Sequence, residues 1–182
     1  VVDFLEDKGV SVFGPSESGA KLEGSKHFSK DLMKTSNIQT AAFKNASSYE
    51  EGLEYLNEMD KAELDLGVVI KADKLAAGKG VFLCNSKIEA KDVLSKIMND
   101  ETFVIKDEKV VIEEKLFGKE VSAFAICDGD SFLTLGFARD YKRLKDYDEG
   151  PNTGGMGGFS HHELVSDELR KQIEENVFSK TL

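Results

Sequence analysis

The chain has 182 residues, of which 40% are hydrophobic, and 24 basic residues stand against 34 acidic ones, so the net charge is −10. This length suits one domain or one and a half, and the composition is sufficient for a hydrophobic core. The excess of acids disfavours nucleic acid as a partner. No apolar run is long enough to span a membrane and no signal-peptide pattern opens the chain, so we expect a soluble cytoplasmic protein.

Both ends of the sequence predict an excerpt from a longer enzyme. Residues 1–15 read as the end of a helix, a short strand and a Gly14-Pro15 turn, and such a strand needs earlier strands to join. Residues 166–182 predict an amphipathic helix capped by Ser166.

The residues between the ends predict helices and strands in a mixed α+β arrangement, much of it antiparallel. Apolar residues at helical spacing cover residues 20–34, and two capping boxes begin further helices, Ser48 with Glu51 and Ser86 with Glu89. Strands are expected at 41–45, 66–72, 81–85, 109–117, 120–128 and 131–138, the last two joined by an Asp128-Gly129-Asp130 hairpin. The helix that follows Ser86 is expected to bury Ile88, Val93, Leu94, Ile97 and Met98. Cys84 and Cys127 stand in apolar strand-like runs and are expected to be buried, reduced thiols.

A lysine and a small-residue loop follow one another in "VVIKADKLAAGKG", residues 68–80. Small residues let backbone N–H groups approach an anion, and a lysine adds a point charge. The spacing matches neither the Walker A motif nor the dinucleotide-binding fingerprint. From these residues alone, a tight hairpin turn with exposed lysines is as good an interpretation as a phosphate site.

Acidic residues mark a second segment, "VVIEEKLFGKEVSAF", residues 110–124. A connection between strands offers backbone C=O and N–H groups to an adenine edge, and a carboxylate can accept hydrogen bonds from ribose hydroxyls. The alternative is the ordinary half-buried strand, in which acids occupy the solvent face.

The third segment, residues 139–158, combines bases with glycines in "RDYKRLKDYDEGPNTGGMGG". Four bases are offset by four acids within residues 139–149, so the segment has no net charge there. A solvated linker is one interpretation, and a site for a phosphorylated substrate, with N–H donors and positive charge, is the other. His27, His161 and His162 show no metal-ligand spacing, so we predict no metal site from the residues themselves.

Taken in chain order, "FGP", "LEGSK", "VIKADKLAAGKGV", "VIEEKLFGKEVS", "DYKR" and "GPNTGGMG" resemble the phosphoribosylamine–glycine ligase family of the ATP-grasp superfamily. The resemblance covers essentially all 182 residues and corresponds to the middle of the family's chain. It implies the end of a preceding domain over residues 1–20 and an ATP-grasp domain from residue 21, incomplete at residue 182. Within it, a small lid subdomain is implied at about 41–112, beside part of a larger central-sheet subdomain.

The resemblance also implies roles for particular residues. ATP would be bound by residues that hold its phosphates, its adenine and its ribose: Lys26, Lys71, Ala77, Gly78, Lys79, Gly80, Glu113, Glu114, Leu116 and Glu120. Lys26 by itself shows no sequence pattern that would distinguish it from a solvated lysine. The catalytic side would comprise Lys142, Arg143 and Asp148, and the substrates would contact Asp140, Asn152, Thr153, Gly154, Gly155, Met156 and Gly157.

The implied reaction joins glycine to 5-phosphoribosylamine in purine biosynthesis. ATP phosphorylates the glycine carboxylate, and the amine attacks the acyl phosphate, leaving glycinamide ribonucleotide, ADP and phosphate. The magnesium ligands of the family are expected beyond Leu182, so this chain alone is not expected to complete catalysis. Three positions depart from the family pattern, Lys74, Arg139 and Tyr141, and they bear on loop flexibility and substrate placement.

Two rival interpretations remain. One is another ATP-grasp enzyme, such as a biotin carboxylase or a different purine ligase, against which "GPNTGGMG" argues. The other is a nucleotide-binding module without catalytic activity, against which the retained Lys71, Lys79, Glu114 and Glu120 argue.

Overall fold

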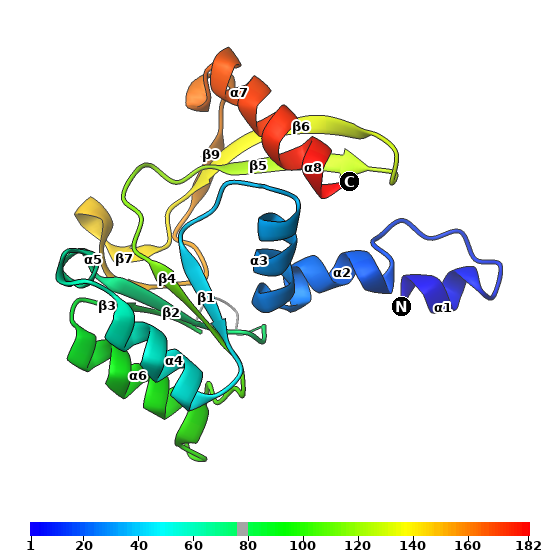
Figure 1. Cartoon of the computed structure of the whole chain (residues 1–182). Helices are drawn as coiled ribbons and strands as arrows, with labels where there is room; N and C mark the ends of the chain where they lie inside the picture. Colours follow the sequence, from blue (N-terminus) through cyan, green and yellow to red (C-terminus); the bar gives the residue numbers. More distant parts are fainter. Residues whose placement is uncertain (76–79) are drawn as a thin grey trace. The chain divides into compact units, whose positions relative to one another are not determined.

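The computed structural model describes residues 1–75 and 80–182, without the side-chain surroundings of residues 61–63, 148 and 152. The described part divides into two compact units. The first contains residues 1–31, 42–75 and 80–115, and the second contains residues 32–41 and 116–182. Figure 1 labels the main elements within each.

The helices and strands include most of those predicted from the sequence, together with several that were not predicted. In the first unit and the segment leading to the second they are α1 (Val2–Glu6), α2 (Glu17–Gly24), α3 (Lys26–Thr35), β1 (Phe43–Ala46), α4 (Tyr49–Glu58), α5 (Lys61–Leu66), β2 (Val68–Ala72), β3 (Val81–Cys84), α6 (Lys87–Asn99) and β4 (Val110–Glu114). In the second they are β5 (Ser122–Cys127), β6 (Phe132–Asp140), β7 (Arg143–Lys145), β8 (Glu149–Asn152), β9 (Gly158–Ser160), α7 (Asp167–Ile173), a π-helical segment (Glu174–Phe178) and α8 (Ser179–Thr181).

The first unit is built on an antiparallel sheet with strand order β1-β4-β2-β3. Its two central strands, "VVIKA" and "VVIEE", are almost continuously apolar and buried. Strands of this kind are covered on both faces, in contrast to the alternating pattern of a half-exposed strand. The register places Ile70 opposite Ile112, both fully buried.

Helices α4 and α6 lie side by side across one face of this sheet (Figure 1). Both begin where the capping boxes predicted, because Ser48 Oγ accepts from the N–H of Glu51 and Ser86 Oγ accepts from the N–H of Glu89, each at 3.2 Å. The core between helices and sheet consists of fully or nearly buried residues: Ala46, Leu56, Met59, Val68, Ile70, Ala72, Cys84, Ala90, Leu94, Ile97, Val110 and Ile112.

One predicted core residue is wrong. Ile88 is 83% exposed, whereas Ala90, Leu94 and Ile97 on the same helix are fully buried. Ile88 lies two residues before the buried Ala90, about 200° of helix rotation away, so it projects from the face of α6 that points away from the sheet.

This difference gives a stability prediction. Leu94→Ala is expected to lower the free energy of unfolding by about 2–5 kcal/mol, because it leaves a cavity in a core packed closely enough that a Cβ at Gly52 would lie 2.9 Å from Leu94 Cδ2. Ile88→Ala is the matched control and is expected to cost less than about 0.5 kcal/mol. Denaturant unfolding of both variants measures the difference, and equal losses would contradict the assigned core.

The N-terminal end of α3 packs on the other face of the sheet. His27 Nε2 lies 2.7 Å from the carbonyl oxygen of Val110, and Asn45 Nδ2 donates to His27 O at 3.2 Å. Lys71 and Glu113 project from this face, since they alternate with the core residues of β2 and β4. Two charged side chains are therefore held beneath α3.

The second unit contains the antiparallel sheet β5-β6-β9 and the two-stranded β7-β8 ribbon. The β5–β6 hairpin turns as predicted: Asp128 Oδ1 accepts from the N–H groups of Asp130 and Ser131, and Gly129 has φ +100°. The C-terminal helical segment contacts β6 through an edge-on pair of Phe132 and Phe178 rings, 5.4 Å apart. Ser166 caps α7 as predicted, with its Oγ accepting from Leu169 N at 3.2 Å.

Three details differ from the expectations. Residues 10–13 form no strand, and Phe13 is 85% exposed, because a strand requires hydrogen-bonding neighbours that the described residues do not supply at this point. Cys127, the last residue of β5, is exposed, although Cys84 is buried as expected. The short strands β7, β8 and β9 were not predicted, because their sequences are rich in charge and glycine.

No helix among the described residues has the length and apolar character needed to cross a membrane. Strands β1 to β4 form one sheet and β5, β6 and β9 another. The lid over residues 41–112 and the boundary at residue 20 stay predictions.

Candidate functional site

The predicted phosphate-binding Lys26 begins α3 and reaches the segment that follows β2. Its Nζ donates to the carbonyl oxygens of Asp73, at 3.3 Å, and Lys74, at 3.1 Å. The helix start is fixed from the same segment, because Asp73 Oδ1 accepts from the N–H of His27 at 2.8 Å and from Ser25 Oγ at 3.0 Å. The ammonium group of Lys26 therefore lies beside the entrance to the glycine-rich loop.

A buried carboxylate holds the same segment from another side. Asp107 is 3% exposed, and its Oδ2 accepts from the N–H of Lys74 at 2.7 Å. Asp73 N donates in turn to the carbonyl oxygen of Lys109 at 3.0 Å. Lys74 is one of the residues that depart from the family pattern, and its side chain is 72% exposed on the surface of this segment.

The glycine-rich loop is described only in part. Ala77, Gly78 and Lys79, three of the predicted phosphate-binding residues, lie outside the described residues. Gly80 lies inside, and its carbonyl oxygen accepts from the N–H of Ala72 at 2.9 Å. This bond extends the pairing of β2 and β3 to the mouth of the loop.

Lys71, the other predicted phosphate-binding lysine, forms an ion pair with Glu113. Its Nζ lies 3.0 Å from Glu113 Oε2, and Lys30 Nζ lies 3.4 Å from Glu113 Oε1. The Glu113 side chain is 7% exposed, whereas that of Lys71 is 29% exposed. A charged group this deeply buried requires partners of opposite sign, and here two lysines supply them.

The residues predicted as an adenine hinge are divided by their contacts. Glu113 uses its carboxylate in the ion pair just described, and Glu114 Oε1 accepts from the N–H of Ala42 at 2.8 Å. The Leu116 side chain is 67% exposed. Recognition of a base by these residues would therefore use backbone groups and the apolar surface of Leu116.

In the second unit, Lys142 lies between two predicted site residues. Its Nζ is 2.9 Å from Glu120 Oε1 and 3.5 Å from Asp140 Oδ2. The hydrogen bond to Glu120 is the main reason why the pKa of Lys142 is raised above its ordinary value. Lys142 therefore remains a cation at neutral pH.

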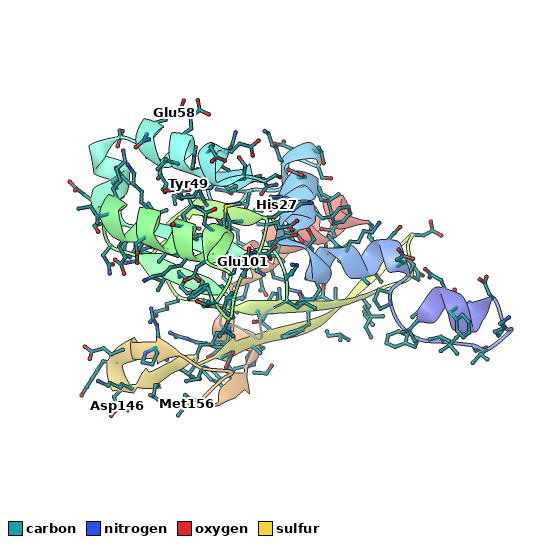
Figure 2. The ribbon with its side chains drawn as sticks, turned by 90° about the horizontal axis from the view of Figure 1, so that it is seen from below. His27, Tyr49, Glu58, Glu101, Asp146 and Met156 are labelled. Carbon is teal, nitrogen blue, oxygen red and sulfur yellow. The ribbon has the colours of Figure 1, made fainter. Side chains whose placement is uncertain are left out.

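The predicted substrate loop is anchored to β6 and β7. Arg143 Nη1 donates to the carbonyl oxygen of Gly150 at 2.6 Å, and Thr153 Oγ1 donates to that of Lys142 at 2.9 Å. The loop closes with Met156 N donating to Tyr141 O at 2.7 Å. Asp146 and Met156 mark this segment in Figure 2.

Within this loop, the contacts of the remaining predicted residues vary. Gly155 N donates to Thr153 Oγ1 at 3.0 Å, and Gly157 O accepts from Tyr141 N at 3.0 Å. Gly154 is exposed, with open space around the position of a Cβ. The side chains of Asp148 and Asn152 are outside what the structure describes, although the backbone of Asn152 pairs with Arg143.

Two positions that depart from the family pattern stack with a third residue. The Arg139 guanidinium lies 5.1 Å from the centroid of the Tyr141 ring, and that ring stacks on Phe159 at 6.3 Å. Phe159 pairs with Arg139 across β6 and β9. The stack therefore stiffens the strands on either side of the substrate loop.

Sequence reasoning missed Lys30, Asp73 and Asp107 as residues that organise the site. Lys30 and Asp107 were hidden because their partners, Glu113 and Lys74, are 83 and 33 residues away. His27 was considered only as a metal ligand; it stands at the start of α3, where Figure 2 labels it, and contacts β4. Its neighbour Lys26 offered no separate signal.

The predicted residues thus gather in two groups, one in each unit. No group of three His, Cys, Asp or Glu side chains in residues 1–75 and 80–182 is placed to hold a metal ion. The first group offers cations beside a glycine-rich loop, and the second offers cations and backbone N–H groups around a glycine-rich turn.

Comparison with known proteins decides the family. The profile described as "Phosphoribosylglycinamide synthetase, ATP-grasp (A) domain" matches residues 24–182. The chain belongs to the phosphoribosylglycinamide synthetase ATP-grasp domain family. The resemblance read from the sequence and the α+β, ATP-grasp fold class are both confirmed.

Individual members of the phosphoribosylglycinamide synthetase family agree. The phosphoribosylamine–glycine ligase of Caldanaerobacter subterraneus subsp. tengcongensis is 44% identical over 177 residues, which are 97% of this chain and 41% of the relative. The trifunctional purine biosynthetic protein adenosine-3 of Gallus gallus is 42% identical over 182 residues, which are all of this chain and 18% of the relative.

A solved structure shows the same similarity in three dimensions. The phosphoribosylamine–glycine ligase of Thermotoga maritima superposes with a TM-score of 0.82 at 44% identity, covering 93% of this chain and 42% of that one. The chain thus spans about two fifths of the length of single-enzyme members of the phosphoribosylglycinamide synthetase family.

Proposed function

We propose that this chain carries the ATP-binding part of a phosphoribosylamine–glycine ligase, which joins glycine to 5-phosphoribosylamine through a glycyl phosphate in purine biosynthesis. One observation carries the proposal beyond family membership. Of the two lysines expected to bind phosphate, Lys71 is the next-to-last residue of β2, and the ammonium group of Lys26 contacts the backbone just after that strand, where the glycine-rich loop begins.

The nucleotide side follows from this placement. The ammonium groups of Lys26 and Lys71 would contact ATP phosphates, and the N–H groups of the loop ending at Gly80 would add neutral donors. The adenine would lie against the backbone after β4 and the exposed Leu116 side chain, and Glu120 would accept from the ribose hydroxyls.

The acceptor side uses the second group of residues. The transfer of a phosphoryl group to glycine develops negative charge, which fixed cations and N–H groups stabilise without reorganisation. Lys142, held as a cation by Glu120 and Asp140, serves this purpose better than it could serve as a base. Arg143 shapes the loop through its bond to Gly150.

Enzymes of this family usually bind ATP together with magnesium, but the described residues contain no group of three side chains that could hold a metal ion. We propose that its ligands, and whatever else turnover requires, lie in segments that the relatives have in addition to the part matched here. No step is assigned to the metal.

Two further proposals concern organisation. We propose that residues 41–112 form a lid that excludes water from the reacting phosphates, which the separate sheet of β1 to β4 supports, and that residues 1–20 end a preceding domain. A cytoplasmic location is also proposed, and the two free cysteines support it.

The test is ADP formation by the complete protein with ATP, glycine and 5-phosphoribosylamine. Release of ADP is expected to require both glycine and the amine, with glycinamide ribonucleotide detected by mass. D-alanine and bicarbonate in place of glycine test other ATP-grasp activities, and turnover with either one alone would contradict the proposal. Binding of ADP without any turnover would instead favour a non-catalytic nucleotide-binding module.

A further inference from the structure

The carboxylate of Glu113 is shared between two lysines that come from different elements. Lys71 stands on the neighbouring strand β2, and Lys30 belongs to α3, which lies across the sheet. The contact to Lys71, at 3.0 Å, is closer than that to Lys30, at 3.4 Å. Each carboxylate oxygen therefore faces one ammonium group.

The two lysines differ in their access to solvent. The Lys30 side chain is 11% exposed, and its ammonium group also lies 5.1 Å from the centroid of the Phe43 ring. The Lys71 side chain is 29% exposed. Lys30, Lys71 and Glu113 thus form a charged trio, in which Lys30 is the inner cation and Lys71 the outer one.

Burial makes the inner cation costly to maintain. Desolvation is the main reason why the pKa of Lys30 lies below its ordinary value, and the charge of Glu113 opposes this shift. Glu114 acts in the same direction as Glu113 but more weakly, and it is exposed. The charge of Glu113 therefore favours the protonated form of Lys30, and the two lysines offset the cost of burying the Glu113 carboxylate.

A count of charges shows what the second lysine changes. One lysine and one carboxylate form a neutral pair, whose attraction for an anion is small. Two lysines and one carboxylate retain one positive charge, and the surplus belongs to the lysine that solvent and a ligand can reach. Glu113 alone is enough to hold Lys71 in position, so positioning does not explain the presence of the second, inner lysine.

We propose that Lys30 is a positioning residue for nucleotide binding: it neutralises Glu113 from inside, so that the charge of Lys71 remains available to a phosphate group. This inference rests on the proposed function, because it takes a nucleotide polyphosphate as the ligand of Lys71. Lys30 itself, enclosed beneath α3, would not touch that ligand.

The proposal differs from a structural role in what it says about charge. If Lys30 only stabilised the fold, its loss would weaken binding of any ligand at the site equally. If Glu113 only oriented Lys71, its replacement by glutamine would weaken phosphate binding. If the trio acts through its net charge, affinity for phosphate follows that charge, and affinity for an uncharged nucleoside does not.

The experiment measures dissociation constants of ADP and adenosine for the complete protein and its variants by calorimetry. Lys30→Met is expected to weaken ADP about tenfold while changing adenosine less than about twofold, because only ADP feels the lost charge. Lys30→Arg keeps the charge and is expected to retain the unaltered affinity. The double variant Lys30→Met with Glu113→Gln restores the net charge and is expected to return ADP to within about threefold of the unaltered protein.

Three results would overturn the proposal. They are an unchanged ADP affinity in Lys30→Met, an equal loss for ADP and adenosine, and a double variant that binds ADP no better than Lys30→Met. If Lys30→Met does not fold, Glu113→Gln alone decides: the proposal requires ADP affinity at least equal to that of the unaltered protein, and weaker binding overturns it.

Lys71→Met separates this inference from the proposed function. If Lys71→Met weakens ADP and Lys30→Met does not, only the role of Lys30 is wrong. If the unaltered protein does not bind ADP, or Lys71→Met binds it normally, the proposed nucleotide site falls and the inference falls with it.

Discussion

Replacing Lys71 by methionine is expected to weaken ATP binding by about one to two orders of magnitude. The variant removes a charge-assisted hydrogen bond to phosphate, which contributes roughly 1.5–3 kcal/mol. Methionine keeps an unbranched side chain of similar length on β2, so the strand and its register should persist. The side chain is part-exposed and Lys30 continues to face Glu113, so the buried carboxylate keeps a cation.

The measurement is the ATP dissociation constant of the complete protein, alongside its melting temperature. Lys96→Met is a matched control, because it removes one lysine charge from the exposed surface of α6, where Lys96 pairs with Asp92. The control is expected to change ATP affinity less than about twofold, since an exposed charge is screened by solvent and salt. A folded Lys71→Met protein with unaltered ATP affinity would remove Lys71 from the nucleotide site.

Replacing Gly155 by alanine is expected to slow turnover at least about tenfold, equivalent to about 1.4 kcal/mol of transition-state stabilisation. Gly155 has φ +126°, a conformation that L-residues rarely adopt. A Cβ there would lie 3.1 Å from Asp140 Oδ1, so the carboxylate beside Lys142 would have to move. Both effects displace groups assigned to the acceptor side.

The same geometry sets the expected cost in stability. Strain at one residue of this kind is of order 1–3 kcal/mol, and an exposed loop can relax part of it. We expect the melting temperature to fall by only about 2–6 °C, while the rate falls by much more. Gly24→Ala is the control, since Gly24 is helical and a Cβ would meet nothing within 4 Å. Normal kinetics for glycine and 5-phosphoribosylamine in Gly155→Ala would exclude a substrate-loop role.

Local interactions account for what could be predicted about the fold. Ser48, Ser86 and Ser166 each cap a helix, because a cap depends on a residue three positions ahead in the sequence. The Asp128 hairpin is equally local. Ile88 was assigned to the core wrongly, because it lies about 200° around the helix from the buried Ala90 and so outside the apolar stripe.

The residues of the candidate site came from the resemblance to the family, and their roles stay predictions. The resemblance to the family indicated Lys26, Lys71, Glu113 and Lys142. The adenine role that it assigned to Glu113 stays a prediction, and the structure adds that the Glu113 carboxylate pairs with lysines from two elements.

The sequence by itself determined the family, the capped helices and the longer strands. Tertiary structure alone decided which charges meet. Lys30 and Glu113 are 83 residues apart, and they are brought together only because α3 covers the face of the sheet opposite α4 and α6. Pairings of this kind depend on strand register and on the packing of whole elements, which local sequence cannot encode. Burial then strengthens the electrostatic interaction between the paired charges.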